Sequence, residues 1–210
     1  MSAPNTGKTK VAILISGRGS NALALIEAAK AADYPAEIAL VISNRPDAGG
    51  LERAAALGAP VKAIDHKPFG RDREAHERAI DAALRDAGIN LVALAGYMRI
   101  LTPFLVRAWQ GRMINIHPSL LPLFPGLDTH QRALDAGVKL HGCSVHWVAE
   151  GVDEGPLIGQ AAVPVLPDDD EPALAARVLA AEHGLYPACL AQAITGVVAP
   201  ADPGAVLSNP

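Results

Sequence analysis

The feature that most constrains the fold is an alternation of short apolar runs with segments that have the spacing of helices. We expect the apolar runs to form strands at residues 11–15, 38–42, 91–95 and 113–116, with a short edge strand at 61–64. The main runs are apolar on both faces, as the buried strands of a parallel sheet are. Helical patterns separate the strands at residues 21–32, 50–57, 71–87 and 103–109. This order predicts an α/β fold with a doubly wound, mostly parallel sheet and right-handed crossovers.

The pattern changes after Gly126. Residues 142–148 alternate small, apolar and polar side chains, which is typical of a partly exposed strand. A turn-rich segment joins them to a second run at 157–165, so we expect a hairpin that forms an antiparallel C-terminal extension of the sheet. Helices are expected on either side of this pair, at residues 129–136 and 171–194. We predict a single domain over residues 10–194, with flexible tails at 1–9 and 199–210.

The composition narrows the class of protein. A chain of 210 residues suits one domain, and 50% hydrophobic against 4% aromatic residues implies an aliphatic core. The net charge of −4 is spread along the chain, so nothing favours a nucleic-acid or membrane partner. No signal peptide or run of 18 apolar residues is visible, and we expect a cytoplasmic protein. Cys143 and Cys189 are expected to be reduced and buried.

The segment SGRGSN at residues 16–21 directly follows the first expected strand and opens a helix. Glycines allow a sharp turn there, and free amides at a helix start favour an anion such as a phosphate. The segment lacks the third glycine of a dinucleotide fingerprint, and no GK[ST] follows, which disfavours NAD and Walker-type nucleotides. The alternative is a Gly-rich turn that only links strand to helix.

The segment MINIHPSLLPLFPG at residues 113–126 ends an expected strand on two polar residues. Asn115 and His117 lie two apart, so both side chains point to the same side of the strand at its carboxyl end, where open α/β sheets bind ligands. A histidine can move protons near neutral pH, and an asparagine amide can donate to an oxygen that gains negative charge. The alternative is a histidine that caps the strand for structural reasons.

The turn GVDEGP at residues 151–156 carries two carboxylates. If Asp153 lay beside His117, it would stabilise the charged imidazole and orient the ring. A plain surface turn is the alternative, because turns rich in Asp, Glu and Gly are common.

The remaining histidines give no sign of a metal site. We expect His66, His76 and His130 to be exposed, and His141 and His146 to be structural residues with hydrogen bonds. No spacing resembles H-E-x-x-H, so no metal is expected.

Taken together, these segments resemble the family of phosphoribosylglycinamide formyltransferases, which are folate-dependent enzymes of purine synthesis. The matching text includes VAILISGRGSNALALIEA, LVALAGYMRIL, MINIHPSLLPLFPGLDTH and VDEGPLIGQAAVPV, and the resemblance spans about residues 10–194. It implies a Rossmann-like formyltransferase fold. It also implies transfer of the formyl group of 10-formyltetrahydrofolate, a co-substrate, to the glycyl amine of phosphoribosylglycinamide, without a metal. The implied partners are small molecules, and the implied state is a monomer or homodimer.

The resemblance also implies roles for individual residues. The catalytic set would be Asn115, His117 and Asp153. The phosphoribosylglycinamide site would be formed by Gly19, Ser20, Asn21 and Glu182. The folate site would be formed by Arg73, Met98, Arg99, Ile100, Leu101, Asn115, Ala149, Glu150, Gly151, Val152 and Asp153. One departure is Leu179, where many relatives carry a Lys or Gln that assists phosphate binding.

Three other functions are the alternatives. Methionyl-tRNA formyltransferase shares the HPSLLP region, but it adds a tRNA-binding domain for which this chain is too short and too acidic. Formyltetrahydrofolate deformylase carries an additional N-terminal domain, and few residues precede the first expected strand here. A non-catalytic nucleotide-binding module would not need Asn115, His117 and Asp153 together.

Overall fold

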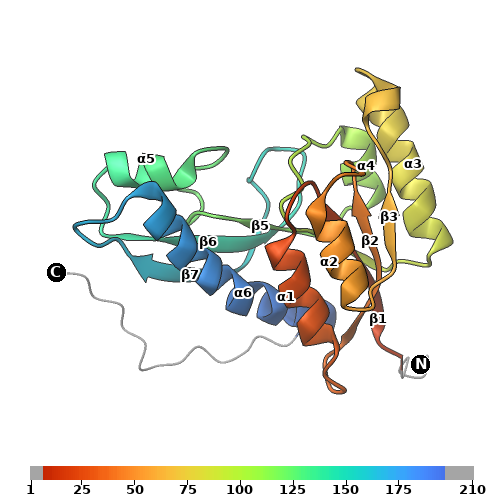
Figure 1. Cartoon of the computed structure of the whole chain (residues 1–210), viewed down its shortest axis with the longest axis horizontal. Coiled ribbons are helices and arrows are strands. Elements are labelled where there is room, and N and C mark those ends of the chain that lie inside the picture. The colour runs from red at the N-terminus through yellow and green to blue at the C-terminus, as the bar shows by residue number, and fades with distance from the viewer. Residues whose placement is uncertain (1–6, 197–210) are drawn as a thin grey trace.

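The computed structural model describes residues 7–196. Their strands form one seven-stranded sheet in the order β3-β2-β1-β4-β5-β6-β7 (Figure 1). The strands are β1 (Thr9–Ile15), β2 (Ala36–Ser43), β3 (Val61–Ala63), β4 (Leu91–Leu94), β5 (Met113–His117), β6 (Leu140–Trp147) and β7 (Leu157–Pro164). The first five strands are parallel to one another, whereas β6 runs antiparallel to β5 and β7 antiparallel to β6. The predicted doubly wound, mostly parallel sheet with an antiparallel extension is therefore confirmed.

The helices cover both faces of the sheet (Figure 1). They are α1 (Ser20–Ala29), α2 (Gly49–Ala56), α3 (Arg73–Asp86), α4 (Pro103–Ala108), α5 (Thr129–Asp135) and α6 (Glu171–Thr195), with a short 3-10 helix, η1 (Lys67–Phe69). Side chains of α1, α2 and α6 pack with Val11, Ile13 and Ile15 of β1. Side chains of α3 and α4 pack with Ala12 and Leu14 of the same strand. Because successive strand residues point to opposite faces, β1 contributes to both cores.

The bounds of the strands and helices differ from the predicted ones by at most three residues at either end. Of the predicted N-terminal tail, residues 1–6 lie outside the described part of the chain, but Thr9 already belongs to β1. Lys8 Nζ also donates to the carbonyls of Ala29 and Ala31. The predicted C-terminal tail at 199–210 lies outside the described residues.

The prediction that His76 is exposed is wrong, because the side chain is fully buried. His76 lies on the face of α3 that also buries Ile80 and Leu84, at the spacing of a helical apolar stripe. Its Nε2 lies 2.8 Å from the carbonyl oxygen of Ile64. His66 and His130 are half-buried rather than exposed. Cys143 and Cys189 are buried and free, as predicted.

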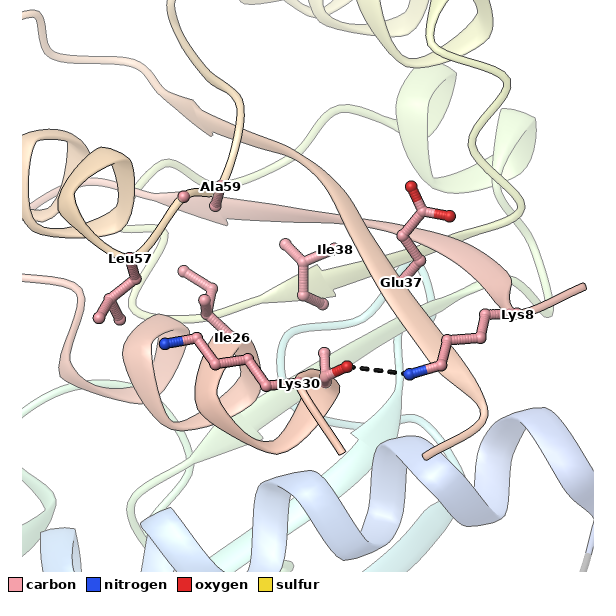
Figure 2. Close-up of a pocket in the computed structure, with 9 residues that line it drawn as sticks. Lys8, Ile26, Lys30, Glu37, Ile38, Leu57 and Ala59 are labelled. Carbon is pink, nitrogen blue, oxygen red and sulfur yellow. Dashed lines mark hydrogen bonds between the residues drawn. The ribbon is translucent and has the colours of Figure 1, made fainter. Parts of the chain in front are cut away.

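A shallow pocket of about 320 Å³ lies between the C-terminal ends of α1 and α2 (Figure 2). Glu37 and Ile38, at the beginning of β2, form one wall. The sequence places its candidate residues at the opposite, carboxyl ends of the strands, so this pocket is separate from them.

Tyr186 joins α6 to the centre of the sheet. Its side chain is fully buried, and its hydroxyl donates to the carbonyl oxygen of Leu94, at the end of β4, over 2.8 Å. The hydroxyl also lies 3.4 Å from the carbonyl oxygen of Ile114 in β5. One phenol therefore fixes α6 beside the two strands that lead to the candidate site.

Replacing Tyr186 with Phe should lower the free energy of unfolding by about 0.5–1.5 kcal/mol, because a buried hydrogen bond is lost while the ring stays. Urea unfolding would measure this loss. Tyr34→Phe is a matched control, since its hydroxyl donates to the Pro187 carbonyl at a half-buried position where water can replace it. A Tyr186→Phe variant as stable as the wild type would contradict this account.

Candidate active site

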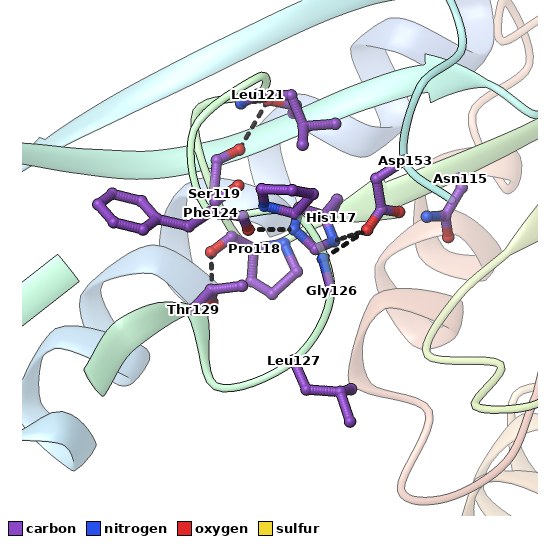
Figure 3. Close-up of polar contacts among 12 residues, drawn as sticks. Asn115, His117, Pro118, Ser119, Leu121, Phe124, Gly126, Leu127, Thr129 and Asp153 are labelled. Carbon is purple, nitrogen blue, oxygen red and sulfur yellow. Dashed lines mark hydrogen bonds and ion pairs between the residues drawn. The ribbon is translucent and has the colours of Figure 1, made fainter. Parts of the chain in front are cut away.

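β5 brings Asn115 and His117 to the carboxyl end of the sheet, as the sequence predicts (Figure 3). The antiparallel partner β6 fixes what lies opposite each of them. Asn115 is paired with His146, and His117 is paired with Ser144. His117 is only 5% exposed, so its polar contacts are made with protein groups.

Both ring nitrogens of His117 face hydrogen-bond acceptors. Nε2 lies 3.0 Å from the carbonyl oxygen of Phe124, and Nδ1 lies 3.3 Å from Oδ2 of Asp153 (Figure 3). A doubly protonated ring can donate to both, whereas a neutral ring can donate to only one. The Phe124 carbonyl and the Asp153 carboxylate therefore fix the ring from both sides.

Asp153 reaches His117 from the loop between β6 and β7. Its backbone has φ of 58°, a left-handed conformation that Asp tolerates better than most residues. Oδ2 also accepts a 2.9 Å hydrogen bond from the backbone amide of Gly126. Burial alone would raise the pKa of Asp153, but the facing His146 ring, the Gly126 amide and the charge of His117 outweigh it and hold the pKa below its usual value. The carboxylate is thus ionised beside the imidazole.

His146 is a member of this cluster that the sequence analysis assigned to a structural role. It is 2% exposed, and its Nδ1 donates to the carbonyl oxygen of Trp147 over 2.9 Å, because a carbonyl oxygen can only accept. Nε2 lies 3.2 Å from Asn115 Nδ2 and 3.7 Å from Asp153 Oδ1. The ring therefore holds the Asn115 amide in one orientation. The sequence alone could not predict this contact, because it depends on the register of β5 with β6, which places His146 opposite Asn115.

The glycine loop forms a second cluster. Gly19 precedes α1 with φ of 67°, and a Cβ there would lie 3.2 Å from the Cα of Gly50. No side chain caps the first turn of α1, so its amide groups are left for another acceptor. Asn21 Nδ2 donates to Glu182 Oε2 of α6 over 2.7 Å. The structure thus brings together the loop residues Gly19, Ser20 and Asn21 with Glu182.

Residues 98–101 and Arg73 form a third group. Met98 and Ile100 are 67% and 65% exposed, which is unusual for large apolar side chains. The Met98 amide donates to the buried hydroxyl of Ser16, and Arg73 Nη1 lies 3.4 Å from the Ile100 carbonyl oxygen. Ser16 therefore attaches this segment to the end of β1. This contact joins residues far apart in the chain, so local sequence patterns could not reveal it.

Within residues 7–196, no group of three or more His, Cys, Asp and Glu residues could hold a metal ion. Among the helices of the same range, none is both long and apolar enough to cross a membrane.

The fold and the site define a class of protein. The chain belongs to the formyl transferase family, which matches residues 9–190. A solved structure of phosphoribosylglycinamide formyltransferase from Brucella melitensis is 54% identical, with a TM-score of 0.86 over 92% of this chain and 100% of that one. Phosphoribosylglycinamide formyltransferase from Escherichia coli is 45% identical over 84% of this chain and 83% of its own length. The trifunctional purine biosynthetic protein adenosine-3 of Drosophila melanogaster is 49% identical over 90% of this chain, which spans only 14% of that longer protein.

The burial of Glu182 gives a pH-dependent prediction for stability. Burial raises the pKa of Glu182 above its ordinary value of 4.5, and the hydrogen bond from Asn21 opposes this only in part. The folded state therefore binds this proton more tightly than the unfolded state does. The resulting stabilisation is complete below pH 4.5 and is lost as the pH rises through the folded-state pKa.

Glu182→Gln keeps an acceptor for Asn21 and removes the ionisation. Relative to the wild type, this variant should become more stable as the pH is raised from 4 to about 8. Thermal unfolding of both proteins across this range would measure the difference, and a constant difference would contradict the assignment.

Proposed function

We propose that the protein transfers the formyl group of 10-formyltetrahydrofolate to the glycyl amine of phosphoribosylglycinamide. Membership of the formyl transferase family and the names of the similar proteins support this activity. The observation that carries the proposal is the position of the Asp153 carboxylate, 3.3 Å from His117 Nδ1, at the strand end to which Asn115 also points. A charged imidazole and an oriented amide together suit an acyl-transfer reaction.

The proposed reaction begins when the substrate amine attacks the formyl carbon. A new C–N bond forms, and the formyl oxygen gains negative charge in a tetrahedral intermediate. The Asn115 amide would donate to this oxygen. The His117 N–H that faces the Phe124 carbonyl would leave that acceptor and donate to the same oxygen. The contact with His146 holds the Asn115 amide in one orientation for this role.

The intermediate then loses the folate nitrogen. The bond from the formyl carbon to that nitrogen breaks, and the proton given up by the attacking amine ends on the departing nitrogen. His117 or a water molecule would carry this proton. Asp153 would support the transfer by stabilising the charged ring and fixing its orientation. The step is balanced without an oxidant, a metal or a covalent enzyme intermediate.

We place the phosphate of phosphoribosylglycinamide at the amino end of α1, beside Gly19, Ser20 and Asn21. Glu182 would contact the substrate next to this group. Leu179 lies on α6 one turn before Glu182 and cannot bind a phosphate, so the backbone amides of the loop would carry more of the interaction. The folate would lie against residues 98–101 and 149–153, with Arg73 nearby. The domain bounds 10–194 and the monomeric or homodimeric state remain predictions.

The direct test is to mix the protein with both substrates and follow the release of tetrahydrofolate. Release should require phosphoribosylglycinamide. Asn115→Ala or His117→Ala should each lower turnover by about 10²- to 10³-fold, because an oxyanion donor is lost. Release that ignores the ribonucleotide would indicate a deformylase, and no release by the wild type would favour a binding module.

Asp153→Asn tests the role of the carboxylate separately. Asn tolerates the left-handed backbone of this position, so the change mainly removes the charge. We expect lower turnover and a pH–rate profile in which the limb that reports the His117–Asp153 pair moves to lower pH, since the cation has lost its counter-charge. A variant with the rate and profile of the wild type would exclude this role.

A further inference from the structure

The segment that carries Asp153 has few attachments to the rest of the protein. We call residues 148–156 the Asp153 loop. At its base, the Val148 amide donates to the Met113 carbonyl and the Trp147 amide donates to the Pro156 carbonyl, each over 2.9 Å. Within the described residues, Glu150 and Asp153 are the side chains through which the interior of the loop, 149–155, bonds to the rest of the chain.

Glu150 is attached to α4 through Arg107. Arg107 Nε donates to Oε1 of Glu150 over 2.7 Å, and Nη2 donates to Oε2 over 3.2 Å. Such two-point contacts fix direction as well as distance, because the planar guanidinium and carboxylate groups must align. The hydrogen bonds from Arg107 also lower the pKa of Glu150, so the carboxylate stays charged.

The helix that carries Arg107 is fixed to the rest of the protein by buried contacts. Leu105 and Val106 of α4 are buried in the core. At its amino end, the Thr102 amide donates to the buried Glu77 carboxylate over 2.8 Å. A side chain bound to Arg107 is therefore held relative to the sheet.

We infer that Arg107 is a positioning residue, whose ion pair with Glu150 fastens the Asp153 loop to α4 and thereby holds Asp153 against His117. The inference rests on the proposed function, in which Asp153 supports His117. Asp153 itself contacts the Gly126 amide, His117 and His146, and the contact with His117 changes when the ring gives up or takes a proton. The contact between Arg107 and Glu150 touches no reacting group, so it keeps the loop in place throughout the reaction.

The size of the effect follows from the exposure of the pair. Arg107 and Glu150 are 67% and 52% exposed, so water and salt screen their attraction. Exposed ion pairs of this kind shift the equilibrium between an attached and a detached loop by a small factor. We therefore expect loss of the pair to lower kcat/KM about two- to fivefold. High salt should reduce the effect.

The test uses the full chain in five forms: wild type, Arg107→Gln, Glu150→Gln, the double variant, and the charge swap Arg107→Glu with Glu150→Arg. Each single variant should lose about two- to fivefold in kcat/KM, the double variant should lose no more than either single one, and the swap should recover most of the loss. In about 0.5 M NaCl the wild type should approach the single variants. Lys30→Gln is the matched control, because its exposed ion pair with Glu27 lies on α1, and its kcat/KM should equal that of the wild type.

Hydrogen exchange of residues 148–156 gives a readout that does not depend on activity. Exchange should be faster in both single variants, and the swap should restore slow exchange. Losses that add in the double variant, or a swap that recovers neither exchange nor kcat/KM, would overturn the inference. A wild-type protein without formyl transfer would refute the proposed function instead, and the exchange data would still decide whether Arg107 holds the loop.

Discussion

The antiparallel pairing of β5 with β6 is the interaction on which the candidate site depends. Its register sets His146 opposite Asn115 and Ser144 opposite His117. It also places the end of β6 beside the beginning of β5, where the Val148 amide binds the Met113 carbonyl. From that point the Asp153 loop returns along β5 to reach His117. A shift of one residue would turn the side chains of β6 to the other face and separate the cluster.

Backbone strain is concentrated around the same histidine. Within residues 7–196, the non-glycine residues with positive φ are Phe124, Asp128 and Asp153. The Phe124 carbonyl accepts from His117, and the Asp153 carboxylate faces the other side of the ring. Such conformations cost about 1–3 kcal/mol each and persist where surrounding contacts fix them. For Phe124 and Asp153, these contacts are the polar contacts of the site itself.

The two clusters of the site use buried carboxylates in opposite ways. Asp153 faces an imidazole and a backbone amide, which hold its pKa down and keep it charged. Among the described residues, Glu182 has one hydrogen-bond partner, the Asn21 amide, and burial raises its pKa. The difference follows from the number and charge of the partners, because a carboxylate retains its charge in the interior only where donors replace water. The first arrangement suits proton chemistry at His117, and the second suits contact with a polar substrate.

The sequence by itself determined the elements and part of the site. Local apolar periodicity predicted the seven strands and the six α-helices, and the spacing of Asn115 and His117 predicted that both lie at the carboxyl end of one strand. The position of the glycines predicted the turn before α1. Tertiary structure decided the rest, including the approach of Asp153 to His117, the inclusion of His146, the Phe124 carbonyl as an acceptor, and the burial of His76. These features depend on strand register and on packing between segments far apart in the chain, whereas local patterns record only the period and polarity of each segment.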